Sequence, residues 1–231
     1  HRDKLGRLNR ISRFDLSDQM TLDYGTARNL ELARNLSDGG SANTLLSIVN
    51  LCHTGMGTRR LHHALTHPWR VKAPIELRLT GVAEFVRNRD LCISIREQTK
   101  ILPDLEKLAG RIGIGRLNPR QAVAVRDALH IAASIKQRLK ESHSPLLIQV
   151  GSSLPACDEM ISQISKAMSD DPPLVINKGG MIKPGYSEKL DQLNESIRGA
   201  RRYIGDLQKI ERERTGISSL KVGFNKIFGY Y

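Results

Sequence analysis

A group of three histidines has the residue type and spacing to bind a metal ion. His62, His63 and His67 lie within one predicted helix, and His63 and His67 are four residues apart, which places their side chains on one face. No glutamate stands between them as in the metalloprotease pattern, and the sequence implies no third ligand. We therefore interpret them as solvent-facing histidines and predict no metal site.

Other residues that could support catalysis lack the context that catalysis requires. The stretch from Gly113 to Gly115 has neither the third glycine nor the preceding strand of a dinucleotide fingerprint, and no phosphate-binding loop of the form GxxxxGKS or GxxxxGKT occurs in the sequence. The single serines and cysteines have no suggestive histidine and aspartate context. We predict no catalytic residue, no cofactor site and no enzyme activity within these residues.

Polar residues near the C-terminal end are the best candidates for binding a partner. Lys221, Asn225 and Lys226 lie at or near a predicted turn, where they could bind phosphates without sequence preference. Thirty-six Lys and Arg against 24 Asp and Glu leave a net charge of +12, which favours nucleic acid as the partner. Aromatic residues are only 4%, so contact with a duplex backbone fits better than stacking on unpaired bases. The sequence also allows the alternative that this tip contacts another protein or only solvent.

A long helix is predicted to carry this tip. Apolar residues recur at steps of three and four from Ser187, the expected N-cap, to about Arg214, which predicts a helix about 42 Å long. Its apolar seam predicts packing along a partner helix, for which the helix starting at Asn118 is a candidate; the seam consists of Leu190, Leu193, Ile197, Ala200, Ile204 and Leu207. A cationic flank lies on another side and consists of Arg198, Arg201, Arg202, Lys209 and Arg212.

A hairpin is predicted after this helix. Thr215 and Gly216 end the helical pattern, and two strands, 220–224 and 227–231, are expected around a turn at Asn225 and Lys226. Because so short a hairpin needs more pairing to be stable, we expect the natural protein to continue past residue 231. The missing initiator methionine also suggests an excised fragment.

The rest of the chain predicts a multihelical body. Cap and proline signals predict helices after Thr54, near Pro74, over 90–102, from Pro103 and from Asn118. The helix near Pro74 has an apolar face made of Ile75, Leu79, Val82, Phe85 and Val86. Residues 174–176 and 181–182 are predicted to form a second hairpin. About nine helices without strand–helix alternation predict a mainly α fold, a multihelical core with a long helix and small β-hairpins, and exclude a parallel sheet.

Cysteine usage and hydropathy bear on location. Cys52, Cys92 and Cys157 are far apart and form no CxxC pair, which argues against a disulfide framework or a zinc ribbon and favours a reducing cytosol. No run of eighteen apolar residues occurs, and residues 1–15 are charged throughout, so neither a membrane span nor a secretory signal is predicted. We expect a soluble, cytoplasmic protein without a membrane partner.

Ordered motifs along the chain resemble the MutS family of DNA mismatch repair proteins. The longest stretch runs from Glu211 to Tyr231. Earlier motifs follow in family order: Met20, Leu22 and Asp23 with Thr26; Asn29 to Leu32; Met56 and Gly57 with Arg59; Arg111 and Ile112 with Gly115 and Arg116; Pro119 and Arg120; Pro172 and Pro173 with Gly179, Gly180, Gly185 and Tyr186. The resemblance covers essentially the whole chain.

This resemblance implies a different structural role for each part of the chain. Residues 1–19 would end a connector helix, residues 20–186 would form the helical core, and residues 187–231 would form a lever helix and the start of a DNA clamp. The full-length protein would be a DNA-dependent ATPase that binds mismatched duplex DNA, with ATP and Mg²⁺ in a remote domain. The family further implies a homodimer, a MutL-type partner and a nucleoid-associated location in the cytoplasm.

An alternative function belongs to a different class. The chain would then be the helical scaffold of a MutS paralogue whose hairpin arm binds protein or recombination intermediates and not mismatches. Salt dependence distinguishes a protein-binding scaffold from a duplex-binding protein, because binding through a phosphate backbone weakens steeply as salt rises.

Overall fold

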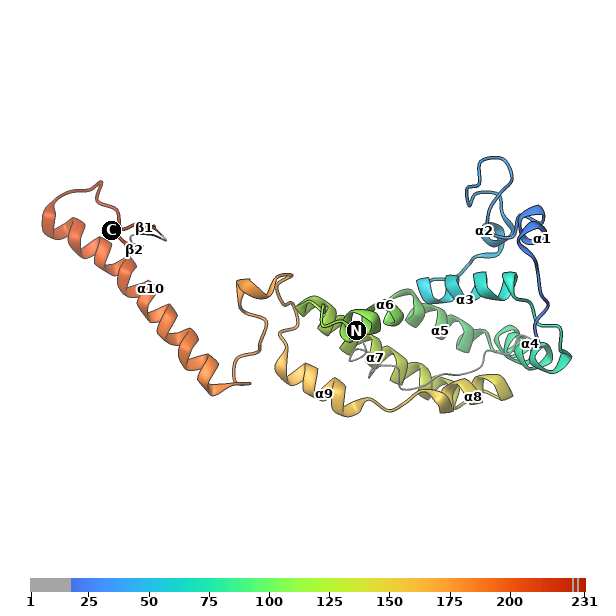
Figure 1. The fold of residues 1–231 in the computed structure, drawn as a ribbon. Helices are drawn as coiled ribbons and strands as arrows, with labels where there is room; N and C mark the ends of the chain where they lie inside the picture. The colour runs from blue at the N-terminus through green and yellow to red at the C-terminus, as the bar shows by residue number, and fades with distance from the viewer. Residues whose placement is uncertain (1–17, 226, 228) are drawn as a thin grey trace, which may run out of the picture.

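The structure, a computed structural model, describes residues 18–225, 227 and 229–231 and consists of a helical body with one projecting arm (Figure 1). The mainly α fold is confirmed, and the described residues contain one two-stranded antiparallel hairpin and no parallel sheet. The body comprises α1 (Tyr24–Asn29), α2 (Leu45–Val49), α3 (Gly55–Thr66), α4 (Lys72–Arg87), α5 (Arg89–Lys100), α6 (Leu105–Gly113), α7 (Pro119–Leu139), α8 (Pro145–Ser153) and α9 (Asp158–Ala167).

Helix α7 is the centre of the body. It packs against α5 and α6 on one side and against α8 and α9 on the other. The predicted start is confirmed, because the Asn118 side chain accepts a hydrogen bond from the Gln121 amide while the Gln121 side chain accepts one from the Asn118 amide. Pro119 occupies the first turn, where a missing amide donor costs nothing.

The apolar core lies where α5, α7 and α8 meet. Leu91, Leu139 and Leu147 are buried there, and the half-buried side chains of Phe85, Ile95 and Ile135 pack around them. Helix α8 approaches α7 closely at this point, because a Cβ placed on Gly151 would lie 3.1 Å from the Cβ of Leu139. The core therefore fixes the helices that support the rest of the molecule.

Helix α4 does not bury the apolar face that its sequence pattern defines. Val82 and Val86 are 57% and 73% exposed, whereas Gly81 and Glu84 are buried. The reason is steric: Gly81 lets α4 approach α8 so closely that a Cβ there would lie 3.0 Å from a methyl group of Leu146. The periodicity correctly predicted a helix, but the close approach selects a different buried face.

An ion cluster joins the starts of α3 and α6. The Arg59 guanidinium donates hydrogen bonds to Asp104 at 2.8 and 2.9 Å and to Glu106 at 2.5 and 2.8 Å. Hydrogen bonds from Arg59, together with the Lys107 amide, lower the pKa of Asp104 from 3.8 to about 2. Asp104 also caps α6 by accepting a hydrogen bond from the Lys107 amide.

Asp104→Asn is expected to make the protein less stable above pH 4. Asp104 is protonated near pH 3.8 in the unfolded state but only near pH 2 in the folded state. The ionised carboxylate therefore stabilises the folded state above pH 4, and this stabilisation is lost as the pH falls towards 2. Asparagine can still accept the capping hydrogen bond, so the substitution removes only the negative charge. The loss of stability should be modest because Arg59 and Glu106 are solvent-exposed. Melting temperatures between pH 2 and 7 test this: parallel curves for the two proteins would contradict it.

The hairpin predicted at 174–182 is wrong. Residues Ile176–Lys178 form a 3₁₀ turn, η2, and Ile182 instead forms an antiparallel bridge with Met168 at the end of α9. Two backbone hydrogen bonds fix this bridge, from the Ser169 amide to the Met181 carbonyl and from the Lys183 amide to the Ala167 carbonyl, both 2.9 Å. The chain therefore returns to the body immediately before it enters the arm.

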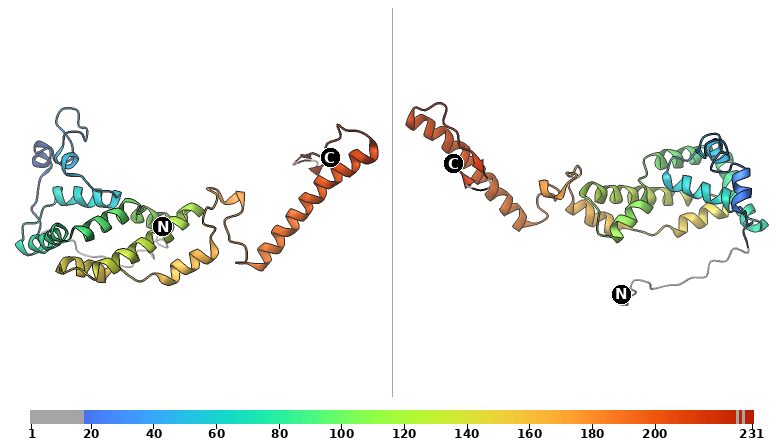
Figure 2. Two further views of the ribbon diagram at one scale, coloured as in Figure 1. Left: turned by 180° about the vertical axis from the view of Figure 1, so that it is seen from behind. Right: turned by 45° about the horizontal axis from the view of Figure 1, so that its top comes forward.

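The arm is α10 (Glu188–Thr215), a single helix of 28 residues, as predicted. Ser187 caps it by accepting a hydrogen bond from the Leu190 amide, and Gly216 ends it with a φ of 70°, a left-handed conformation that glycine adopts without strain. The predicted packing along the helix that starts at Asn118 is wrong for the described residues, because α10 buries none of its residues and extends away from α7 (Figures 1 and 2). No helix in the described part of the chain has both the length and the apolar character to cross a membrane.

Candidate nucleic-acid interface

Ion pairs anchor the base of the arm to the body. Arg126 on α7 is 13% exposed and pairs with Asp170 at 2.7 Å, and Asp170 also pairs with Lys183 at 3.2 Å. These contacts raise the pKa of Arg126 and lower the pKa of Asp170, so these two groups stay charged at neutral pH. Because Lys183 stands four residues before the Ser187 cap, the start of α10 is tethered to the central helix.

The far end of the arm carries the predicted hairpin in a shorter form. Strands β1 (Phe224–Asn225) and β2 (Gly229–Tyr230) pair antiparallel, with Phe224 opposite Tyr230 and Asn225 opposite Gly229. Hydrogen bonds of 2.9 and 3.0 Å between Gly223 and Tyr231 extend the pairing. The predicted hairpin is therefore confirmed, but its turn follows Asn225, and residues 220–222 are outside the strands.

Residues 220–222 are instead fastened to α10. The Arg212 Nε donates a hydrogen bond of 2.6 Å to the Leu220 carbonyl, and the Val222 amide donates one of 3.0 Å to the Gln208 side chain. Gln208 and Arg212 are four residues apart and so lie on one face of the helix. The hairpin is thus held back against the arm, as Figure 1 shows.

One of the three candidate phosphate-binding residues, Lys221, lies in this fastened segment, and Asn225 lies in β1. Lys221 is exposed and lies between the two residues tied to α10, so its backbone is fixed while its side chain projects into solvent. The side-chain Oδ1 of Asn225 accepts a hydrogen bond of 2.7 Å from the Ile227 amide, which leaves the side-chain Nδ2 of Asn225 without a partner among the described residues. Lys226, the third candidate, lies outside the described residues.

The cationic flank of α10 contains both paired and unpaired residues. Arg198 and Arg202 contact Glu195 at 3.8 and 2.7 Å, and Arg212 holds the Leu220 carbonyl. Arg201 and Lys209 are exposed and pair with no carboxylate in the described part of the chain. In the cationic flank and the described part of the hairpin segment, the cations left for an external anion are therefore Arg201, Lys209 and Lys221.

Arg201 lies at the middle of α10, and Lys209 and Lys221 lie towards its C-terminal end. Around the helix axis, at 100° per residue, Gln208 and Arg212 lie about 20° to either side of Arg201. Arg201 is therefore on the face of α10 to which the hairpin is fastened. An arm that presents two helix cations and a hairpin lysine can bind several phosphates of an extended polyanion. Sequence reasoning found the cations from residue type, but it missed Gln208 and Arg212 as the residues that hold the hairpin. The only available signal was their spacing of four residues.

The three histidines are arranged for packing. His62 and His67 are exposed, as predicted, but His63 is half-buried and stacks on His67 with ring centroids 4.5 Å apart. Partial burial, followed by the nearby His67 and Arg60, lowers the pKa of His63. Among the described residues, no three His, Cys, Asp or Glu side chains gather in a way that could hold a metal ion.

A body of packed helices and one long cationic arm with a hairpin fastened to it define a helical protein built to hold a tip far from its core. Comparison with known families identifies the chain. Residues 25–220 match the family described as MutS domain III, and the chain belongs to the MutS family, which confirms the resemblance.

Individual relatives agree with this assignment. The chain is 39% identical over 227 residues to a DNA mismatch repair protein MutS from Salinibacter ruber, covering 98% of this chain and 25% of that protein. It is 36% identical over 231 residues to one from Symbiobacterium thermophilum, covering 100% of this chain and 26% of that protein. The relative from Bacteroides thetaiotaomicron is 36% identical over 228 residues, or 99% of this chain and 26% of that protein. The chain thus spans about a quarter of the length of these relatives.

Proposed function

We propose that this chain is the lever and clamp-proximal core of a MutS-type mismatch repair ATPase. Residues 187–231 would be the lever helix and the start of the clamp, residues 20–186 the core, and residues 1–19 the end of a connector. The observation that carries the proposal is α10, an unbroken helix of 28 residues that projects from the body and carries, at its middle and towards its end, cations that pair with no described carboxylate. The family membership supports mismatched duplex DNA as the ligand.

The arm would couple DNA binding to a remote nucleotide site. The 231 residues contain no phosphate-binding loop of the GxxxxGKS or GxxxxGKT form, so they do not fit ATP and Mg²⁺, which we assign to another part of a longer polypeptide. What these residues supply is a stiff connection that starts at the tethered Arg126, Asp170 and Lys183 cluster and ends at the hairpin. We further propose a homodimer, a MutL-type partner and a nucleoid-associated location in the cytoplasm for the full-length protein.

Duplex backbone contact through Lys221, Asn225 and Lys226 is the core of this proposal. Lys221 presents an unpaired amine, Asn225 an unpaired amide donor among the described residues, and Arg201 and Lys209 extend the cationic surface along α10. Phosphate contacts of this kind position a protein on DNA and carry no sequence information directly. A mismatch repair protein needs such contacts, because mismatches occur in any sequence.

The double variant Lys209→Glu/Lys221→Glu in the full-length protein is expected to weaken duplex binding about tenfold or more near 0.1 M salt, because each charge-assisted contact contributes roughly 1.5–3 kcal/mol. The slope of log K against log salt should become shallower by about 1.8, because two phosphate contacts are lost. Fluorescence anisotropy with a labelled duplex containing one mismatch, across a salt series, measures both quantities.

The matched control is Lys140→Glu/Lys166→Glu, which makes the same charge change at exposed positions on the body. It should leave the salt slope unchanged. An unchanged slope in the arm variant would show that these lysines do not contact the backbone. Duplex binding by the unaltered protein without steep salt dependence would favour the alternative, a protein-binding scaffold.

A further inference from the structure

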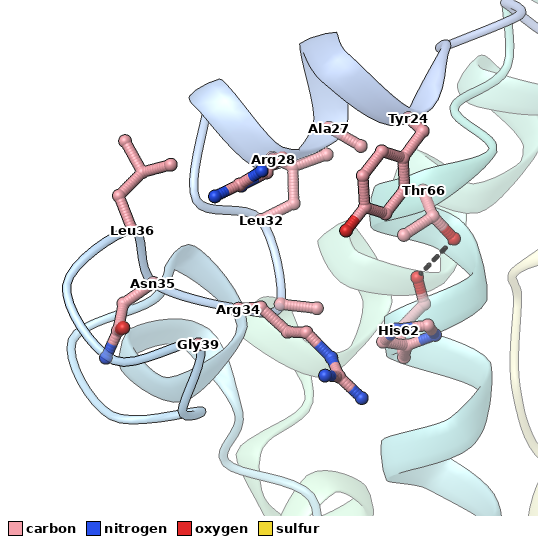
Figure 3. Close-up of a pocket in the computed structure, with 11 residues that line it drawn as sticks. Tyr24, Ala27, Arg28, Leu32, Arg34, Asn35, Leu36, Gly39, His62 and Thr66 are labelled. Carbon is pink, nitrogen blue, oxygen red and sulfur yellow. Dashed lines mark hydrogen bonds between the residues drawn. The ribbon is translucent and has the colours of Figure 1, made fainter.

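A cavity of about 530 Å³ lies at the end of the body away from α10. It opens between α1, the loop over residues 30–40 and the C-terminal half of α3 (Figure 3). The interior is largely apolar, with Ala27, Leu32, Ala33 and Leu36 among its lining residues. Leu32 is 7% exposed, which makes it the floor of the cavity. Its volume is in the range of ordinary ligand pockets.

The loop that forms one wall is fixed by its own hydrogen bonds. Asn35 is 8% exposed; its amide group donates to the Ala42 carbonyl and its oxygen accepts from Ser37 and Asp38. The Glu31 side chain accepts a hydrogen bond of 2.6 Å from the Leu36 amide. The cavity is therefore preformed, and little loop ordering would oppose binding.

Cationic groups without partners surround the opening. Arg28 descends from α1, and Arg34 reaches from the loop towards His62 on α3 (Figure 3). Neither guanidinium pairs with a carboxylate of residues 18–225, 227 or 229–231, although both are exposed. Guanidinium groups bind carboxylates in paired, directional hydrogen bonds. An apolar interior with two free arginines at its edge fits a ligand that carries an apolar group beside carboxylates.

The surroundings favour a protein ligand over nucleic acid. Leu30, Ile48 and Leu51 are 58%, 72% and 76% exposed, so the end of the body that holds the cavity also carries exposed apolar side chains. Ala27, Leu32, Ala33 and Leu36 can enclose an apolar side chain, whereas a phosphate group placed against them would lose its hydration. Both polar atoms of the Asn35 side chain already make hydrogen bonds within the loop.

We propose that this cavity docks a segment of a separate protein, in which a bulky apolar side chain enters the cavity and adjacent Asp or Glu carboxylates bind Arg28 and Arg34. His62 adds an imidazole at the α3 side of the opening. The occupant is defined by chemistry: an acidic peptide with one apolar anchor. The proposal does not depend on DNA binding by the arm, which lies at the other end of the molecule.

Selection from a phage-displayed library of random 12-residue peptides tests this on the full-length protein, with counter-selection on Arg28→Glu/Arg34→Glu. Enriched peptides are expected to contain a bulky apolar residue next to carboxylates. A synthetic enriched peptide should bind at least about tenfold more weakly to the double variant, because two charge-assisted contacts are lost. Ala27→Trp, which fills the cavity without changing charge, should weaken binding to a similar extent.

Arg111→Glu/Arg116→Glu is the matched control, because both arginines are exposed and lie at the end of α6, outside the cavity. It should bind the peptide normally. No enrichment on the full-length protein, enrichment without carboxylates, or unchanged binding in Arg28→Glu/Arg34→Glu and Ala27→Trp would each overturn the proposal. So would a parallel loss of affinity for a 12-nucleotide single strand of DNA, which would make the cavity a nucleic-acid site. Circular dichroism confirms that each variant is folded.

Discussion

Leu139→Ala is expected to destabilise the body by about 3 kcal/mol, because it leaves a cavity between α5, α7 and α8. Leu139 is 4% exposed and shares the core with Leu91 and Leu147. The close approach of α8 at Gly151 limits how far the helices can move to fill the space. Hydrogen exchange followed by mass spectrometry should show amides of α7 and α8 exchanging roughly 100-fold faster, the factor that corresponds to this energy.

Ile93→Ala provides the comparison for this core substitution. Ile93 lies on α5 two residues after Leu91 but is 56% exposed, so its truncation removes few contacts and should change exchange rates little. Equal effects of the two substitutions would mean that the contact between α5, α7 and α8 is not the stabilising core of the body.

Helix boundaries were predictable because capping is a local property. Thr54, Asn118 and Ser187 each accept the hydrogen bond that was expected from their type and position. The 28-residue arm was predictable for the same reason: no proline interrupts it, and a glycine ends it. In each case, residues within four positions of one another carry the information.

Packing between distant segments was not predictable. An apolar stripe on α4 indicates that one face should be covered, but Gly81 gives α8 access to a different face. The glycines at 179 and 180 suggested a turn between two strands, yet Ile182 pairs with Met168, because a bridge to α9 competes with the local hairpin. These outcomes depend on which distant segments pack together, and local periodicity and turn patterns do not carry that information.

The candidate interface was only partly predictable. Lys221 is exposed beside the hairpin, and Asn225 lies at the turn as expected. The side-chain oxygen of Asn225, however, is already used by the hydrogen bond from the Ile227 amide. Arg212, assigned to the cationic flank, instead binds a carbonyl eight residues away. Hydrogen bonds from side chains to distant backbone have no periodic signature, so residue type alone cannot show which cations are already engaged.

On the function proposed above, Gly199→Pro is expected to break the arm and to uncouple duplex binding from ATP hydrolysis in the full-length protein. Proline removes an amide donor and its ring collides with the carbonyl four residues earlier, which costs about 3 kcal/mol or more in a helix interior. No residue of α10 is buried, so tertiary packing within the described residues cannot compensate. Spin labels at positions 189 and 213 should give one narrow distance near 36 Å in the unaltered protein, from 1.5 Å per residue, and a broad, shorter distribution in the variant.

Gly199→Ala is the matched substitution, because a Cβ at this position meets nothing within 4 Å and alanine favours the helix by about 1 kcal/mol over glycine. It should preserve the narrow distance and the stimulation of ATP hydrolysis by mismatched duplex. The proline variant should still hydrolyse ATP and bind duplex, since neither the remote nucleotide site nor the hairpin cations are altered, but mismatched DNA should no longer change the hydrolysis rate. If a visibly broken arm left that stimulation intact, α10 would not transmit the signal, because a kinked helix cannot carry a rigid displacement from hairpin to body.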